Sequence, residues 1–334
     1  MIRVLGAGII GLSVAEELVT RGHDVQVVDP APGSGASHAA AGMLSPAGEL
    51  WHGESELYEL GRQSLAGWPS FAQRLGVDLR LGTVIAGADR EDVQQIERNV
   101  ALMAAHGDDA QCLTRSELSK LEPGLGAVAG GALLPHDHSV DPRAVMAALL
   151  ARLGDRVVPS ATSKADVTII ATGATLPEPF SALVRGVRGE ILRLRVSPAD
   201  LPERVVRGLV HGEPVYLVPR VGGELVVGAT QQEHDGAPIV TAEGVWRLLH
   251  AARRLMPGID RAEVVELTAR DRPGTPDNLP LVGPTGEPSV VLAGGHFRHG
   301  VMLAPLTARA VAAYLDEGRV IAALDPRRLM GVLA

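Results

Sequence analysis

Three glycines stand at fixed spacing near the start of the chain, in Gly6-Ala7-Gly8-Ile9-Ile10-Gly11. Glycines at this spacing allow a tight turn, a close approach of the backbone to a pyrophosphate, and close packing of a helix on a strand. Asp29 follows them at close to the ~20 residues expected of an acid that binds a ribose hydroxyl. This pattern predicts a dinucleotide site, but by itself it leaves NAD and FAD equally open.

The glycine pattern has this meaning only between a strand and a helix, and both are predicted. Residues 2–5 are a short aliphatic run, 9–21 have helical periodicity, and 25–29 are a second apolar run that ends in the acid. The N-terminus of such a helix offers N–H groups and partial positive charge to a phosphate. Strand, helix and strand in this order predict a Rossmann-like unit.

The remaining chain alternates between helical and extended patterns. Residues 165–173 are an apolar run typical of a strand buried in a parallel sheet. Residues 215–220 and 224–230 are predicted to form a hairpin, and 290–293 a further strand. Capping signals stand at Thr114–Glu117 and at Asp141-Pro142. Helices are expected at 56–75, 89–106, 142–153, 241–256 and 301–317.

Composition excludes several classes of protein. The formal net charge of -8 disfavours nucleic-acid binding, and no apolar run approaches the ~18 residues of a membrane span. The first residues lack a secretory pattern, so we expect a cytoplasmic location. The single cysteine, Cys112, excludes an internal disulfide and is expected to be a buried or idle thiol. His136-Asp137-His138 lacks a third ligand at suitable spacing, so no metal site is expected.

Further motifs accompany the glycine pattern, in a fixed order along nearly the whole chain. They are Ala39-Ala40-Ala41-Gly42-Met43-Leu44, Ala171-Thr172-Gly173, Tyr216-Leu217-Val218-Pro219-Arg220, Val227-Gly228-Ala229-Thr230, Arg272-Pro273-Gly274-Thr275-Pro276-Asp277 and Gly295-His296-Phe297-Arg298-His299-Gly300. Together they resemble the D-amino-acid-oxidase-like flavoprotein superfamily, and are most similar to its thiamine-pathway glycine oxidases.

The resemblance implies an α/β fold in two domains, which a length of 334 residues also favours. One is a Rossmann-like FAD-binding domain, and the other is an α+β substrate domain with a mixed or antiparallel sheet. The expected FAD-binding domain is discontinuous, with residues 1–45, 140–175 and 270–334. The substrate-binding domain then takes residues 46–139 and 176–269.

The resemblance also implies that FAD is held non-covalently by backbone-rich segments. Gly300 precedes the last long helix, whose N-terminus would stabilise negative charge on a reduced flavin. Family members usually have several more strands after the helix at 142–153, so 154–165 is shortened here and no adenine contact is assigned to it. The implied cofactor-binding residues are Gly6, Gly8, Ile9, Ile10, Gly11, Asp29, Pro30, Ala36, Ser37, Ala41, Gly42, Met43, Gly173, His296, Phe297, Arg298, His299, Gly300, Val301 and Met302.

The substrate of such an enzyme needs an anchor for its carboxylate. Arg272 is the leading candidate, because a planar guanidinium makes two parallel charge-assisted hydrogen bonds; the alternative is a surface ion pair with Asp271. The hydroxyl of Tyr216 is expected to donate a further bond, unless this tyrosine only packs. Arg298 resembles the family arginine beside flavin and substrate, although a loop arginine that binds carbonyls would look the same. His299, like His296, is taken as a loop residue and not as a proton-transfer group.

The expected function is FAD-dependent oxidative deamination of a small amino acid, with glycine first and molecular oxygen as acceptor, in the making of the thiamine thiazole. Gln231 and Pro214 depart from the residues expected in glycine oxidases, so sarcosine and small D-amino acids stay open. A dehydrogenase of the same superfamily, a nicotinamide-dependent reductase and a non-catalytic FAD-binding partner protein are the rival interpretations. Assembly into a homo-oligomer is left open.

Overall fold

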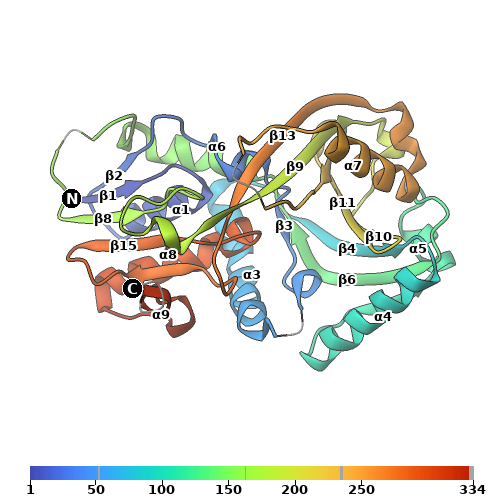
Figure 1. The fold of residues 1–334 in the computed structure, drawn as a ribbon, viewed down its shortest axis with the longest axis horizontal. Coiled ribbons are helices and arrows are strands. Elements are labelled where there is room, and N and C mark those ends of the chain that lie inside the picture. The colour runs from blue at the N-terminus through green and yellow to red at the C-terminus, as the bar shows by residue number, and fades with distance from the viewer. Residues whose placement is uncertain (52, 162, 234–235, 331–334) are drawn as a thin grey trace.

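The computed structural model describes residues 1–51, 53–161, 163–233 and 236–330, which fold into two β-sheets side by side (Figure 1). The first sheet has the fingerprint strand β1 near its middle. Its strands, in spatial order, are β14 (Leu281–Pro284), β15 (Val290–Gly294), β8 (Val167–Ile170), β1 (Ile2–Leu5), β2 (Val25–Val28) and β7 (Val157–Val158). All neighbours are parallel except β14 and β15, so this is the predicted Rossmann-like sheet.

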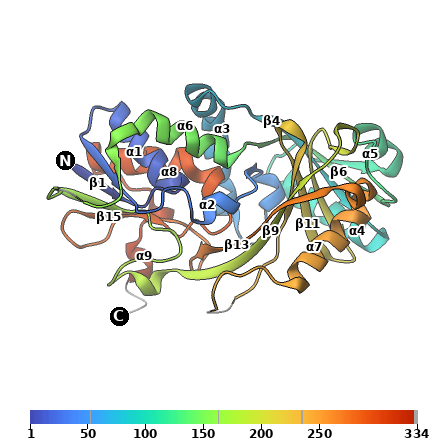
Figure 2. The same cartoon turned by 90° about the horizontal axis from the view of Figure 1, so that it is seen from above.

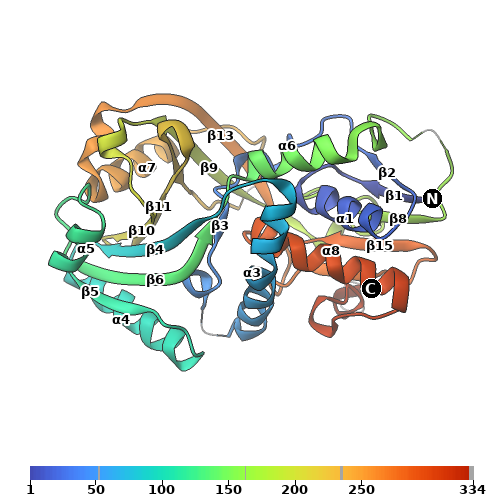
Figure 3. The same ribbon diagram turned by 180° about the vertical axis from the view of Figure 1, so that it is seen from behind.

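Helices α1 (Ile9–Thr20), α6 (Pro142–Leu153) and α8 (Gly300–Glu317) pack together beside this sheet (Figure 2). Leu12, Val14 and Leu18 of α1 are fully buried, because this helix lies between the sheet and its neighbours. Helix α3 (Ser55–Leu75) packs on α8 (Figure 3). Apolar helices that cover a parallel sheet form one core with it.

The second sheet is larger and mostly antiparallel, but β4 runs parallel to β10. Its path is β13 (Glu263–Gly274), β9 (Arg185–Arg195), β12 (Glu224–Gly228), β11 (Glu213–Pro219), β10 (Val205–Val210), β4 (Arg80–Gly87), β6 (Gly130–Ser139) and β3 (Met43–Leu44), with β5 (Gln111–Thr114) beside β6. Helices α4 (Arg90–Ala105), α5 (Arg115–Leu121) and α7 (Ala242–Leu255) accompany it (Figure 1). The expected combination of an α/β unit with a mixed-sheet unit is confirmed.

Most predicted elements are present within a residue or two of their expected ends. The capping box at Thr114 and Glu117 forms, and the side chain of Asp141 accepts from the backbone N–H of Arg143. Strands β4 and β6 were not predicted from the sequence. The segment of small residues that leads to β3 begins with a short helix, α2 (Ala36–Ala39).

Two surface expectations can be compared with the structure. No helix in the described part of the chain is long and apolar enough to cross a membrane. Cys112 is exposed on β5, so the expectation of a buried thiol is wrong: the edge strand leaves its side chain outside the core, and idleness is the alternative that stands. The cytoplasmic location stays a prediction.

Candidate active site

A cavity of about 830 Å³ lies where the two sheets meet. Residues from both sheets line it, because β13 and the segment after α2 reach from one sheet to the other. Every predicted site residue except Gly11 lines this cavity: Gly6, Gly8, Ile9, Ile10, Asp29, Pro30, Ala36, Ser37, Ala41, Gly42, Met43, Gly173, Tyr216, Arg272, His296, Phe297, Arg298, His299, Gly300, Val301 and Met302. Pro214 and Gln231 line it too.

The fingerprint glycines shape the narrow end of the cavity by lacking side chains. Gly6 has φ +101°, and a Cβ there would lie 2.4 Å from the carbonyl oxygen of Ala171. A Cβ on Gly11 would lie 2.0 Å from the carbonyl oxygen of Gly6. Gly11 therefore lets α1 pack closely on β1, as the spacing predicts. It shapes the site through this packing and does not line the cavity itself.

The N-terminus of α1 faces the cavity with backbone donors. Gly8 is the N-cap and gives no side-chain cap, while the N–H of Ile9 donates to Ser37 Oγ at 3.0 Å. Asp29 accepts from the N–H groups of Ala7 at 2.7 Å and Ala31 at 2.8 Å, which fixes its carboxylate at the end of β2. A glycine-lined helix terminus with an acid beside it fits the diphosphate and ribose of a dinucleotide.

The shortened segment 154–165 lies at the outer edge of the first sheet. The carbonyl of Val158 accepts from the N–H of Asp29 at 3.0 Å, so β7 supports the acid from outside the cavity. Thr162 lies outside the described residues, and no described residue of 154–165 lines the cavity.

The loop over 36–43 is tied to both sheets. Gly42 has φ +72°, and a Cβ on it would lie 2.1 Å from the carbonyl oxygen of Val140. Arg143 donates from Nε to the carbonyl of His38 at 3.0 Å, and the guanidinium of Arg220 donates to the carbonyl of Ala41. The small residues of this loop thus present a fixed backbone wall to the cavity.

Helix α8 closes the other wall. It begins at Gly300, with its N-terminus at the cavity, and the carbonyl of Met302 accepts from Ser64 Oγ at 2.7 Å and from Trp68 Nε1 at 2.9 Å. Those two bonds come from α3 and fix the first turn of α8. The N-terminal charge of this helix is therefore held beside the place where an isoalloxazine is expected.

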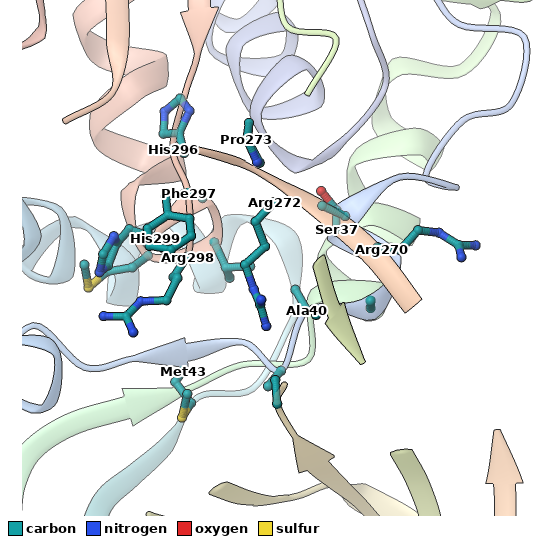
Figure 4. Close-up of a pocket in the computed structure, with 18 of the residues that line it drawn as sticks. Ser37, Ala40, Met43, Arg270, Arg272, Pro273, His296, Phe297, Arg298 and His299 are labelled. Atoms are coloured by element: carbon teal, nitrogen blue, oxygen red, sulfur yellow. The ribbon is translucent and has the colours of Figure 1, made fainter. Parts of the chain in front are cut away.

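Arg272 extends from β13 into the cavity (Figure 4). Its Nη1 donates to the carbonyls of Thr230 at 3.2 Å and Arg188 at 3.3 Å, and burial lowers its pKa. A Cβ on Gly189 would lie only 2.2 Å from Nη2, closer than van der Waals contact allows, so this glycine makes room for the guanidinium. Asp271 instead pairs with Arg188 at 2.7 Å, so the alternative of an Arg272–Asp271 surface pair is wrong.

Tyr216 lies beside this guanidinium. Burial raises the pKa of its hydroxyl, which the positive charge of Arg272 partly offsets. A Cβ on Gly228, its partner across β11 and β12, would lie 2.4 Å from the hydroxyl oxygen. The hydroxyl is thus held next to Arg272, where a neutral phenol can donate to the same carboxylate.

Arg298 points into the same space as Arg272, above Met43 (Figure 4). Its Nη2 lies 2.7 Å from one carboxylate oxygen of Glu49, and Nη1 of Arg207 lies 2.7 Å from the other. Burial opposes ionisation of Glu49, but the two guanidiniums outweigh it and hold its pKa at about 2. Glu49 therefore stays charged and fixes Arg298 at the cavity, so Arg298 is not simply a loop arginine on carbonyls.

The two histidines of the C-terminal loop are both buried. His296 Nε2 is bonded to Thr307 Oγ1 at 2.8 Å, and burial lowers its pKa to about 3. Burial likewise lowers the pKa of His299 to about 4, and its Nε2 lies 3.8 Å from Glu49. Burial thus favours the neutral form of both rings, so neither is expected to act as a cationic general acid.

Glu49 and Arg207 were missed by the sequence analysis. A signal existed for each: Glu49 is a lone acid in a largely apolar stretch at 43–51, and Arg207 is the one charge within Val205–Val210. Arg207 faces Tyr216 across β10 and β11, which only the register of the sheet reveals. Asp137 is a further buried acid, bonded to Ser45 Oγ, and burial raises its pKa to about 7.

Comparison with known proteins gives a consistent result. The model of the family "FAD dependent oxidoreductase" matches residues 1–314. Glycine oxidase from Geobacillus kaustophilus is 31% identical, over 97% of this chain and 95% of that protein. The solved structure of a glycine oxidase from that organism superposes with a TM-score of 0.85 at 31% identity, over 99% of this chain and 96% of the other.

A bifunctional ThiO/ThiG protein of Nostoc sp. is 33% identical over 94% of this chain. The chain spans about half of that longer relative, 52% of its length. The family match covers both the fingerprint and the strand that carries Arg272, and the cavity fits the cofactor that the family's name gives. The chain belongs to the FAD dependent oxidoreductase family, and FAD is its cofactor.

Proposed function

We propose that this protein oxidises a small amino acid, with glycine as the preferred substrate, to the imine. The observation that carries the proposal is the guanidinium of Arg272, placed with Tyr216 in the cavity that the fingerprint glycines line. Overall, the amine loses two electrons and two protons, oxygen becomes hydrogen peroxide, and water releases glyoxylate and ammonia from the imine. Relatives of about this length that are named glycine oxidase support this substrate.

The mechanism assigns the chain mainly to positioning. The fingerprint glycines and the N-terminus of α8 would hold FAD, which would supply the acceptor for a hydride from the substrate's α-carbon. Arg272 binds the substrate carboxylate, Tyr216 donates a second hydrogen bond to it, and Arg298 holds the opposite side of the cavity. Fixed reacting geometry supplies much of the rate gain in such a reaction, and no side-chain acid or base is required.

We further propose the predicted division into domains, with 1–45, 140–175 and 270–334 for FAD and 46–139 and 176–269 for the substrate. Residues 331–334 of that range lie outside the described part of the chain. Support comes from the two sheets, between which β13 crosses. The role of the product in making the thiamine thiazole is proposed from relatives named ThiO/ThiG.

We also propose that FAD is bound non-covalently. Cys112 does not line the cavity, and His296 is bonded to Thr307 within the core. Denaturation in acid should therefore release all yellow colour into the supernatant. Flavin that stays with the precipitated protein would contradict the proposal.

The function is tested by mixing the purified holoenzyme anaerobically with glycine, sarcosine, D-alanine and L-alanine. We expect glycine to bleach the flavin absorbance fastest and L-alanine not to bleach it. Bleaching by no amino acid would end the assignment. Admitting air then separates two classes: an oxidase recovers its colour and forms peroxide, whereas a dehydrogenase recovers only with an added acceptor.

A further inference from the structure

Strand β13 presents a second arginine to the cavity, two residues before Arg272. Arg270 shares its face of the strand, because side chains alternate with a period of two. It lines the same cavity, but its side chain points away from the Arg272 guanidinium, past Ser37 (Figure 4). The two arginine side chains therefore point to different parts of one cavity.

The surroundings of Arg270 are those of the phosphate end. Its Nε donates to the carbonyl of Ser34 at 2.8 Å, and its Nη1 to the carbonyl of Ala269 at 2.8 Å. Ser34 begins the loop whose Ser37 meets the N–H of Ile9 at the start of α1. The guanidinium is thus fastened by two edges to backbone next to the helix terminus that fits a diphosphate.

Side-chain charge at this end of the cavity is otherwise unfavourable for an anion. Asp29 supplies a carboxylate beside the fingerprint, and the whole chain has a formal net charge of -8. Arg207, Arg272 and Arg298, the other described arginines of the cavity, gather around Glu49 and Tyr216 at the substrate end. Arg270 is the described cavity arginine that lies at this end, where its charge can balance a diphosphate.

We propose that Arg270 binds the diphosphate of FAD. Strand β13 then contacts both reactants: Arg272 binds the substrate carboxylate, and Arg270, two residues earlier, binds the cofactor diphosphate. The proposal is independent of which amino acid is oxidised, because it concerns the cofactor alone. It also gives the second sheet a direct part in FAD binding, besides the fingerprint of the first sheet.

The test measures FAD release from the holoenzyme on dilution, by the recovery of free flavin fluorescence, at several salt concentrations. Arg270→Gln should raise the Kd for FAD about tenfold, as expected for the loss of one charge-assisted contact. Arg270→Lys should restore most of the affinity, since a lysine keeps a point charge for phosphate. Arg195→Gln is the matched control, because Arg195 is exposed on β9 and does not line the cavity.

Salt dependence distinguishes a phosphate contact from a structural role. A contact with the diphosphate predicts that added salt weakens FAD binding less in Arg270→Gln than in the native protein. A Kd within twofold of native, with unchanged salt dependence, would overturn the proposal. Equal weakening by Gln and Lys would overturn it too, because the bonds to Ser34 and Ala269 would then be what matters. If Arg270→Gln does not fold, Arg270→Met, which keeps the aliphatic stem, takes its place.

Discussion

The two ends of the cavity are built by different means. At the fingerprint end, the groups that we propose bind the cofactor are backbone N–H groups and the space left by missing side chains within residues 6–11, with Asp29 close by in sequence. At the substrate end, the groups are side chains from the 3₁₀ turn Ala47–Glu49, from β10, β11 and β13, and from the loop before α8. Backbone sites can be specified by a short local motif, whereas a side-chain cluster depends on sheet register and on distant segments.

This contrast has a functional consequence. The fingerprint end tolerates no added atoms, because Cβ positions on Gly6 and Gly11 already meet backbone oxygens. The substrate end depends on compensated charge, because Glu49 lies between two guanidiniums. Steric changes should therefore damage the first end, and charge changes the second.

The largest effect on turnover is expected from Arg272→Ala. Removal of two charge-assisted hydrogen bonds to the substrate should lower kcat/KM by about 10³-fold while the protein stays yellow. Steady-state kinetics with glycine measure this. Arg253→Ala, an exposed arginine paired with Asp260 on the surface, is the control. Native kinetics in Arg272→Ala would show that the substrate carboxylate is anchored elsewhere.

Gly11→Ala should break the fingerprint end. The added Cβ would lie 2.0 Å from the Gly6 carbonyl oxygen, so α1 must move and FAD binding should weaken by about 100-fold or more. Gly124→Ala is the matched control, because Gly124 does not line the cavity and the nearest atom to its Cβ position is the flexible end of Met256, at 3.2 Å. Flavin content after purification and fluorescence titration give the answer. Equal flavin retention in both variants would mean that close packing of α1 is not needed.

Glu49→Gln removes the charge between Arg207 and Arg298. The guanidiniums of Arg207 and Arg298 then lose the counter-charge between them, so we expect a lower Tm and a fall of about 10–100-fold in kcat/KM. Glu213→Gln, which alters an exposed pair with Arg247, should change neither quantity. The distinction between the two ends would fail if Glu49→Gln bound FAD more weakly than the native protein but kept the native kcat/KM per bound flavin.

The smallest catalytic effect is expected from Asp137→Asn, which should alter the dependence of stability on pH. The pKa of Asp137 is about 7 in the folded protein against an ordinary 3.8, so folding favours its protonated form. The contribution of Asp137 to the free energy of unfolding is therefore complete below about pH 4 and is lost as the pH rises through 7. The loss amounts to at most about 4 kcal/mol, since each pKa unit corresponds to about 1.4 kcal/mol.

Thermal unfolding at pH 5 and pH 8 measures this effect. The asparagine side chain of Asp137→Asn cannot ionise, so the Tm of the variant relative to native should rise between the two pH values. Ser45→Ala, which removes the hydrogen bond to Asp137 and leaves the acid in place, should keep the native trend. A relative Tm that falls with pH would contradict the buried, proton-holding state of Asp137.

The sequence could predict whatever rests on local pattern. Glycine spacing, the strand and helix on either side of it, and Asp29 predict the cofactor end, because backbone geometry there is set by neighbours in sequence. The caps at Thr114 and Asp141 follow for the same reason. Arg272, Tyr216 and Arg298 were named through resemblance to a family, since a chain with 31 lysines and arginines offers no local means of choosing among its cations.

The positions of Glu49, Arg207 and Arg270 relative to the cavity became visible only in the folded chain. The register of β10 on β11 sets Arg207 opposite Tyr216, and the turn at 47–49 brings Glu49 between Arg207 and Arg298. The bond from Arg207 to Glu49 joins residues 158 positions apart, and its energy depends on burial that no local pattern records. The sequence by itself determined the cofactor fold and its glycines. Tertiary structure decided which charges share a cavity, because electrostatic partners are chosen by distance in space.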